Sequence, residues 1–163
     1  MENINSKFTW PVLRLLMGWT FAWAFFDKLF GLGFATTEAK AWVNGGSPTL
    51  GFLKFATKDP LAEFYQGLAG NPSVDWLFMI GLLLIGVALI LGIGVRIASV
   101  SGIVMLLLMY SAVLLPENNP FLDDHIINSI VLIGVMVSNS GNYFGLGNWW
   151  SNTTLVKKYP FLR

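Results

Sequence analysis

The chain has no cysteine among its 163 residues and only one histidine. Without thiols it cannot form disulfide relays, thiolate metal sites, iron–sulfur clusters or c-type haem attachments. A single imidazole also cannot supply both axial ligands of a bis-histidine haem within one chain. We therefore expect no haem, iron–sulfur cluster or metal, and any electron transfer must use a bound organic carrier or a partner subunit.

Charged residues are scarce as well. They make up 12% of the chain, whereas about 25% is typical of soluble domains. Ten Lys and Arg residues nearly balance nine Asp and Glu residues, so nothing indicates a polyanionic partner, and no nucleic acid is expected. Hydrophobic residues account for 55% of the sequence and the mean hydropathy is +0.63. This composition indicates an integral membrane protein.

Four apolar segments are predicted to form transmembrane helices, because only helices satisfy their own backbone hydrogen bonds in lipid. They cover residues 10–30, 76–95, 97–115 and 120–140. Arg14 interrupts the first segment, the segment is rich in aromatic residues, and no small-x-small cleavage site follows, which favours a retained anchor over a signal peptide. We predict one domain over residues 1–163, an all-α integral membrane protein built as a four-transmembrane-helix bundle.

The connection between the first two spans, residues 34–74, is too long for a simple turn. Ser47-Pro48 and Asp59-Pro60 each place a capping residue before a proline, which is typical of a helix start. One apolar stripe follows the second start: Leu61, Phe64, Tyr65 and Leu68. We expect a long outer loop that contains short amphipathic helices lying on the membrane surface or capping the bundle.

Basic residues near the helix ends predict the orientation. The N-terminal side, the turn between the second and third spans and the tail over 141–163 contain Lys7, Arg14, Arg96, Lys157, Lys158 and Arg163. The connection PENNPFLDD before the fourth span has no Lys or Arg, whereas Lys40, Lys54 and Lys58 in the long loop weaken the asymmetry without reversing it. We predict a multi-pass protein of the cytoplasmic membrane with both termini in the cytoplasm. Aromatic and then basic residues in the tail are typical of a membrane-surface anchor.

The fourth span opens with a polar cluster, Asp123, Asp124 and His125. A purely structural role would explain it: Asn119 would cap the helix, Pro120 would take its first position, and aspartates near a helix N-terminus are favoured by the dipole. A histidine beside a carboxylate is also the usual arrangement for proton transfer near neutral pH. The sequence supports both interpretations.

Further polar residues extend this cluster into the bundle. Asn128 lies one turn below Asp124, and Ser129 lies one turn below His125, which predicts a ladder of polar groups. Polar groups inside a membrane are candidates for function. Tyr110, near the outer end of the third span and level with His125, either packs with a satisfied hydroxyl or lines the same site.

One stripe of the first predicted helix contains Arg14, Gly18, Phe21, Phe25 and Lys28. Arg14 and Lys28 are about 21 Å apart along it, so a bundle-facing stripe would place one cation near each membrane surface. Arg14 could equally be a topology charge that snorkels to the cytoplasmic face. Asp27 points to a different side as a partner for a neighbouring helix, and Asp27 and Lys28 could equally be solvated charges. The glycines of the second span, Gly81, Gly86, Gly92 and Gly94, predict close helix packing.

Four stretches of the chain, in their order and spacing, resemble the DoxX/DoxD membrane protein family. They are LRLLMGWTFAWAFFDKLF, WVNGGSPTLGFLKFA, LLLIGVALILGIGVR and ENNPFLDDHIINSIVLI. The similarity extends over nearly the whole chain and is greatest to the large subunit of thiosulfate:quinone oxidoreductase. It implies a four-helix membrane protein that, with a small partner subunit, oxidises thiosulfate to tetrathionate and passes electrons to quinone.

The resemblance also implies roles for individual residues. By position, the family's arginine early in the first helix is Arg14, its lysine at the end of that helix is Lys28, and its aspartate–histidine start of the fourth helix is Asp124-His125. The family often has glycine a few residues before the lysine, where this chain has Ala24-Phe25-Phe26, so the wall of the pocket differs.

These residues and the resemblance together give one hypothesis. A quinone head group lies between helices near the outer surface, and His125, held by Asp124, exchanges its proton. The sequence does not decide whether Asp123 or Asp124 orients the ring. Lys28, helped by Lys40 or Lys54, attracts the anionic sulfur substrate. The expected catalytic residues are His125 and Asp124, and the expected quinone- or substrate-binding residues are Arg14, Asp27, Lys28, Tyr110 and Asn128.

Two other functions stay open. A non-enzymatic scaffold or assembly subunit would bind membrane lipid and anchor a redox partner, and the absence of redox-active residues supports it. A transporter or channel is disfavoured, because the spans lack a matched pair of Gly/Pro interruptions, although a proton path through Asp124, His125 and Asn128 stays open. The sequence does not decide whether a small partner subunit or a second copy of the chain, in a homo-oligomer, joins the protein.

Overall fold

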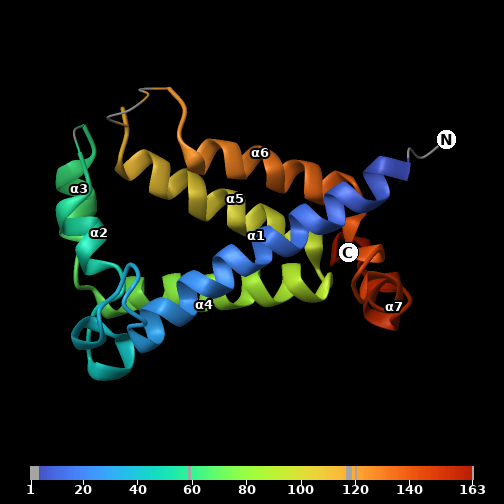
Figure 1. The fold of residues 1–163 in the computed structure, drawn as a ribbon, viewed down its shortest axis with the longest axis horizontal. Coiled ribbons are helices and arrows are strands. Elements are labelled where there is room, and N and C mark those ends of the chain that lie inside the picture. Colours follow the sequence, from blue (N-terminus) through green and yellow to red (C-terminus); the bar gives the residue numbers. More distant parts are fainter. Residues whose placement is uncertain (1–3, 59, 117–118, 120, 163) are drawn as a thin grey trace.

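The computed structural model describes residues 4–58, 60–116, 119 and 121–162, and the regular elements within this part of the chain are helices (Figure 1). The four long ones are α1 (Ile4–Phe30), α4 (Pro72–Leu91), α5 (Val95–Ala112) and α6 (Asp124–Val137). The short ones are α2 (Leu50–Phe55), α3 (Ala62–Gly67), α7 (Gly147–Ser151) and α8 (Thr154–Lys158). Single 3₁₀ turns lie at Glu38–Lys40, Trp42–Asn44, Ser140–Asn142 and Pro160–Leu162.

The four long helices pack around one apolar core. α1 contacts α4 and α6, and α5 contacts the same two helices, so each long helix has two long neighbours. All four contribute to the core: Met17, Phe21, Phe25, Met79, Leu82, Ile85, Leu89, Val95, Ala98, Leu106, Leu132 and Val135. For the part of the chain that the structure describes, the prediction of an all-helical protein is confirmed.

The two ends of the molecule differ in charge. The termini end consists of the start of α1, the α4–α5 turn, the end of α6, and α7 and α8, and the loop end consists of α2, α3, the α5–α6 connection and the adjoining helix ends (Figure 1). Within the described residues, the termini end has no Asp or Glu and contains Lys7, Arg14, Arg96, Lys157 and Lys158. The loop end mixes both signs: Asp27, Lys28, Glu38, Lys40, Lys54, Lys58, Glu63, Asp75, Asp123 and Asp124.

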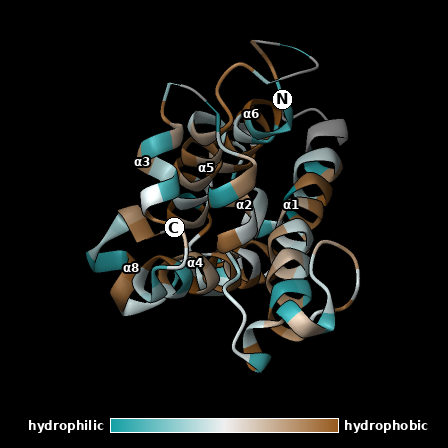
Figure 2. Ribbon diagram, turned by 90° about the vertical axis from the view of Figure 1, so that its left-hand side faces the viewer, coloured by the Kyte–Doolittle hydropathy of each residue, from teal (hydrophilic) through white to brown (hydrophobic). Residues whose placement is uncertain are grey.

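Two of the described helices, α4 with 20 residues and α5 with 18, are long and apolar enough to cross a membrane. Only 33% of the most apolar window of each is buried, unlike the sequestered core helix of a soluble protein. Their outward faces expose large apolar side chains such as Leu77, Leu84, Val104 and Leu108, and Figure 2 shows hydrophobic turns along the long helices among pale and hydrophilic ones. Soluble monomers rarely expose apolar patches of this extent, so these helices indicate membrane association.

The second predicted span begins four residues earlier than expected, at Pro72. The side-chain oxygen of Asn71 accepts a hydrogen bond from the N–H of Ser73 at 2.9 Å, and the proline takes the first helical turn. This is the usual pairing of cap and proline at a helix start. The helix ends at Leu91, because Gly92 adopts a left-handed conformation (φ 72°).

The fourth long helix is shorter than predicted and begins at Asp124. Asn119, expected to cap it, instead accepts hydrogen bonds from the N–H groups of Phe121 and Leu122 in a turn. Pro120, expected at the first helical position, lies outside the described residues. With 14 residues, α6 is about 21 Å long.

The long loop contains two short helices, as predicted. The Ser47 hydroxyl accepts the N–H of Leu50 at 3.2 Å, so Ser47 caps the turn that leads into α2. Asp59, the second predicted cap, lies outside the described residues. Only part of the predicted α3 stripe is covered: Tyr65 is buried and Leu68 half-buried, whereas Leu61 and Phe64 are exposed.

Small residues bring α1 and α4 into close contact. A Cβ atom at Gly86 would lie 2.8 Å from the backbone nitrogen of Ala22, and one at Gly18 would lie 2.9 Å from the backbone nitrogen of Ile90. Backbone cannot move aside as a flexible side chain can. This confirms the expected packing role of Gly86 and identifies Gly18 and Ala22 as its counterparts, in the small-xxx-small spacing of membrane helices.

We expect Gly86→Leu to force α1 away from α4 and to lower the free energy of unfolding by about 1–3 kcal/mol, the usual cost of overpacking. Unfolding in mixed micelles of increasing SDS fraction, followed by circular dichroism, measures it. Gly51→Leu on α2 is the matched control, since nothing lies within 4 Å of a Cβ placed there. Equal unfolding midpoints for the two variants would contradict the α1–α4 contact.

Candidate functional site

A hydrogen-bonded aspartate–histidine pair lies at the start of α6. Asp123 is the residue before the helix, and its backbone is extended (φ −139°, ψ −176°). One of its carboxylate oxygens accepts the N–H of His125 at 3.0 Å and that of Ile126 at 3.2 Å. The other lies 2.6 Å from Nδ1 of the His125 ring. The helix cap therefore holds a carboxylate against an imidazole.

The sequence left open which aspartate orients His125, and the hypothesis used Asp124; in the structure the partner is Asp123. Asp124 is the exposed first residue of α6, and its carboxylate has no hydrogen bond with the described residues. A capping side chain folds back over the first turn, which places the Asp123 carboxylate next to the ring two residues later. The side chains of His125 and Asp123 are 21% and 17% exposed. With Nδ1 held by Asp123, Nε2 is the ring nitrogen left to exchange a proton.

The environment of Asp123 acts on its pKa in both directions. Burial raises the pKa of Asp123, but the hydrogen bond with the His125 ring, the backbone N–H groups and the charge of a protonated His125 together lower it below the ordinary carboxyl value. A carboxyl pKa that is lower in the folded protein adds stability above the unfolded pKa, about 3.9. That stability is lost as the pH falls through the folded value.

We therefore expect wild-type protein to lose more unfolding free energy than Asp123→Asn between pH 6 and pH 3. The asparagine keeps a capping oxygen but does not ionise. Parallel SDS titrations of both proteins at several pH values measure the difference. If the two curves fall in parallel, the Asp123 carboxylate is not stabilised by its partners in the fold.

Three other predicted polar groups surround this pair. The Tyr110 hydroxyl donates to the Phe121 carbonyl at 3.2 Å and so ties α5 to the chain that enters α6. The Ser129 hydroxyl donates to the His125 backbone carbonyl at 2.7 Å, so the ladder does not continue through it to the ring. Asn128 is half-buried, and its amide makes no hydrogen bond with the described residues. Because positions three apart share one helix face, Asn128 and His125 can reach the same ligand.

Arg14 lies at the termini end, far from this pair, and is 0% exposed. One terminal nitrogen donates to the carbonyls of Leu89 and, at 3.1 Å, Ile90. The other donates to the carbonyls of Tyr143 at 3.2 Å and Phe144 at 2.8 Å. The snorkelling alternative is therefore wrong, and the bundle-facing one is confirmed. Backbone carbonyls take all four terminal N–H donors, so only a buried Nε without a partner remains for the predicted ligand.

Asp27 and Lys28 are at the loop end. Asp27 is 2% exposed, and its carboxylate accepts the N–H groups of Phe34 at 3.3 Å and Ala35 at 3.0 Å. It fastens the following loop to α1, so a solvated charge is the wrong description of Asp27. Lys28 is half-buried and forms no ion pair within the described chain.

The structure does not bring Asp27 and Lys28 together with His125. The loop end of α1 lies beside α4, and both views place it away from the start of α6 (Figures 1 and 2). The predicted site is thus divided among three places. His125, Tyr110 and Asn128 lie along the start of α6, Asp27 and Lys28 lie at the end of α1, and Arg14 is at the opposite end of the molecule.

Sequence reasoning missed Asp75. It is buried in the first turn of α4, and one carboxylate oxygen accepts the hydroxyl of Ser47 at 3.0 Å, the hydroxyl of Thr49 at 2.5 Å and the N–H of Thr49 at 3.2 Å. This anchors the loop that enters α2. An acid in a first helical turn is ordinarily explained by the helix dipole, and partners 26 and 28 residues away leave no local signal.

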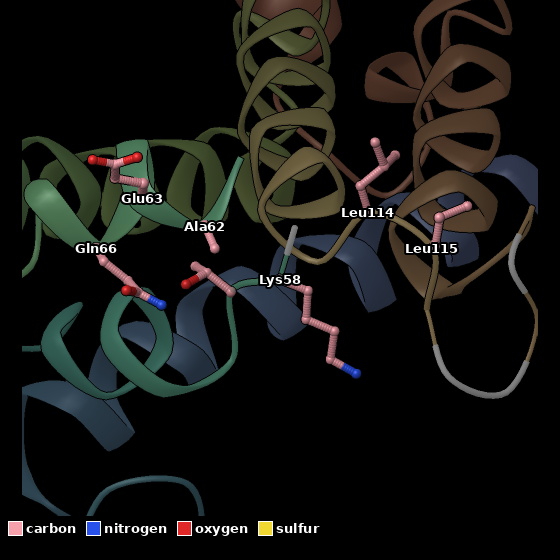
Figure 3. A pocket seen from close by; sticks show the side chains of 7 residues that line it. Lys58, Ala62, Glu63, Gln66, Leu114 and Leu115 are labelled. Atoms are coloured by element: carbon pink, nitrogen blue, oxygen red, sulfur yellow. The ribbon is translucent and has the colours of Figure 1, made fainter. Parts of the chain in front are cut away.

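A cavity of about 700 Å³ opens at the loop end between α3 and the chain that follows α5. Figure 3 shows Lys58, Glu63 and Gln66 on the α3 side and Leu114 and Leu115 across from them. Beside it, the Tyr65 hydroxyl lies 2.5 Å from that of Ser111 and joins α3 to α5. None of the predicted site residues lines this cavity.

No protein-family model, no curated protein and no solved structure matches this chain. The DoxX/DoxD resemblance therefore stays a prediction from the residues themselves.

Proposed function

We propose that the chain is a four-span protein of the cytoplasmic membrane, with α1, α4, α5 and α6 crossing the bilayer. The shared core supports it, since these helices form one bundle with apolar outward faces. The basic residues at the termini end favour the cytoplasmic side for both termini. The loop end, with its six described acidic residues, then faces the opposite side.

We infer that this chain is the membrane subunit of a quinone-linked oxidoreductase. One observation carries the inference, the 2.6 Å contact between the Asp123 carboxylate and Nδ1 of His125. A carboxylate-held imidazole with an available Nε2 is suited to proton exchange near neutral pH. Reduction of a quinone takes up two electrons and two protons, so a proton donor beside its carbonyl oxygen is required.

The described residues fit a quinone head group at this place. His125 Nε2 and the Asn128 amide lie on one face of α6 and provide two hydrogen-bond donors for quinone oxygens. The opposite side of α6 carries the exposed apolar residues Ile127 and Ile130, so that side suits contact with lipid while His125 and Asn128 face the bundle. The contact with Nδ1 supports Asp123 rather than Asp124 as the residue that orients His125 in this proposal.

The resemblance to thiosulfate:quinone oxidoreductases suggests the reductant. Two thiosulfate ions form one sulfur–sulfur bond in tetrathionate and release two electrons, which the quinone accepts with two protons. Local positive charge for the anion would come from Lys28, Lys40 and Lys54, which lie among the six described acidic residues of the loop end. The residues that would contact thiosulfate are supplied by this end or by a small partner subunit.

A second function, a membrane scaffold that anchors a redox partner, rests on a different observation. Arg14 and Asp27, two of the predicted binding residues, are buried in contacts with the backbone of their own chain. Such contacts stabilise a fold whatever its activity.

Purified full-length protein in detergent separates the two functions. Thiosulfate-dependent reduction of a soluble quinone analogue, together with near-stoichiometric quinone in a solvent extract, is the result expected of the enzyme subunit. Bound quinone without turnover points to a missing partner subunit, which co-purification would identify. Phospholipid alone in the extract, with no turnover even in the partner's presence, would exclude the oxidoreductase and leave the scaffold.

A further inference from the structure

The termini end contains a second cavity, of about 210 Å³, which the proposed function does not use. It lies between the α4–α5 turn, the end of α6 and α7. Its polar lining residues include Arg96, Asn139, Asn142, Asn148 and Asn152, with Trp150 beside them. Pockets that enclose whole ligands usually measure roughly 300–1,000 Å³, so this one has the size for a small group or a head group.

Rigid backbone forms the walls of this cavity. A Cβ atom at Gly141 would lie 2.6 Å from the Gly92 carbonyl oxygen, and one at Gly147 would lie 2.4 Å from the Gly141 carbonyl carbon. The N–H of Leu146 donates to the Leu91 carbonyl at 2.8 Å. These contacts hold the tail against the α4–α5 turn, so closely packed backbone forms the cavity.

The cavity offers donors and positive charge to an anion. Arg96 makes neither a hydrogen bond nor an ion pair with the described residues, and the same holds for the side-chain amides of Asn139 and Asn142. Arg96 stands in the first turn of α5, whose cap, Gly94, provides no side-chain acceptor for the N–H groups there. Those groups and the helix dipole favour negative charge. Asn148 and Asn152 already donate to backbone carbonyls and shape the wall.

A buried cation lies directly behind this wall. An Nη atom of Arg14 is 2.9 Å from the position of a Cβ on Gly92, and Gly92 lines the cavity. Arg14 is 0% exposed, its Nε has no partner, and no carboxylate of the described chain pairs with it. Backbone carbonyls solvate the guanidinium but do not neutralise it, and a buried charge without a counter-ion is unfavourable. An anion in the cavity would compensate this charge.

We propose that this cavity binds an anionic phosphate group at the cytoplasmic surface of the membrane. Arg96 would hold the phosphate oxygens by charge-assisted hydrogen bonds, and the amides of Asn139 and Asn142 would complete the contacts. A phospholipid head group and a soluble phosphate present the same chemistry. The proposal does not depend on the reaction at the loop end.

Binding is tested with full-length protein in neutral detergent. The probes are inorganic phosphate, short-chain phosphatidylglycerol and an uncharged diacylglycerol with the same chains, and the readout is the rise in unfolding temperature with ligand concentration. We expect saturable stabilisation. Saturation by inorganic phosphate identifies a soluble ligand, whereas saturation by phosphatidylglycerol alone, with diacylglycerol inert, identifies a lipid head group.

Variants assign the binding to the cavity. Arg96→Gln should weaken the apparent affinity about tenfold or more, because it removes a charge-assisted contact, and Asn142→Ala about threefold. Lys158→Gln removes one charge from the same end outside the cavity and should change the affinity less than about twofold. Asn142 is exposed and its side chain holds nothing in the fold, so it tests the site even if Arg96→Gln does not fold. Absence of saturable binding, or equal weakening by Arg96→Gln and Lys158→Gln, would overturn the proposal.

Discussion

Replacement of Arg14 by glutamine should destabilise the protein by about 3–5 kcal/mol, the cost of breaking a buried charged contact. The expected result is unfolding of the termini end at an SDS fraction well below that of wild type. Arg14 is buried among backbone carbonyls, which would keep their desolvation cost and lose their donors. Glutamine can donate to two of the four at most.

The reason lies in how α4 ends. The last four carbonyls of a helix have no partner within it. Here the Ala88 carbonyl accepts N–H groups of Gly92 and Ile93 at 2.9 and 3.1 Å, and the Leu91 carbonyl accepts that of Leu146. The two between them, of Leu89 and Ile90, accept hydrogen bonds from Arg14. A cation at a helix C-terminus also complements the dipole.

Two variants make this expectation specific. Arg14→Lys keeps the charge but replaces the planar, forked guanidinium with a compact ammonium group. It should therefore unfold at an SDS fraction between those of wild type and Arg14→Gln. Arg96→Gln removes an exposed cation from the same end and should unfold at the wild-type SDS fraction in the absence of added phosphate or lipid. If Arg14→Gln unfolds at the same SDS fraction as Arg96→Gln, then the Arg14 side chain does not stabilise the C-terminal end of α4.

Much of the bundle could be predicted from the sequence, because its signals are local. Hydropathy located α4 and α5, and the stripe of Arg14, Gly18 and Phe21 was one of two alternatives for α1, the one that the structure buries. The partners of Arg14 could not be predicted in this way. They lie 75 to 130 residues away and are backbone carbonyls, which no side-chain pattern reveals.

The choice between Asp123 and Asp124 shows a different limit. Either aspartate can cap a helix, and a shift of one residue in the helix start decides which carboxylate meets the His125 ring. That shift depends on the extended backbone of residue 123, which sequence patterns locate only to within a few residues. The tail shows a related limit. Its aromatic and basic composition predicts a surface anchor but does not reveal that its glycines pack against the α4–α5 turn.

Loss of the imidazole should have the largest effect on turnover. In the assay that shows quinone reduction, with a partner subunit if one is needed, we expect His125→Gln to lower kcat by about 10²–10⁴-fold, the usual contribution of a general acid–base group. Glutamine keeps hydrogen-bonding capacity at that place but does not exchange a proton at neutral pH. Quinone content in the solvent extract should therefore change less than the rate.

The two neighbouring aspartates then separate the mechanism from a general charge effect. Asp123→Asn leaves the helix cap in place but presents the ring with a neutral partner, so it should lower kcat and shift the pH at which the rate is half-maximal. Asp124→Asn removes the same charge one residue later, where no contact with the ring exists, and should leave both unchanged. Both substitutions remove one negative charge at the start of α6, and asparagine at position 123 keeps a capping oxygen for the N–H groups of His125 and Ile126. A larger change in rate for Asp123→Asn at unchanged stability therefore points to the hydrogen bond with Nδ1. Equal effects of the two, or full turnover in His125→Gln, would exclude His125 as the proton donor.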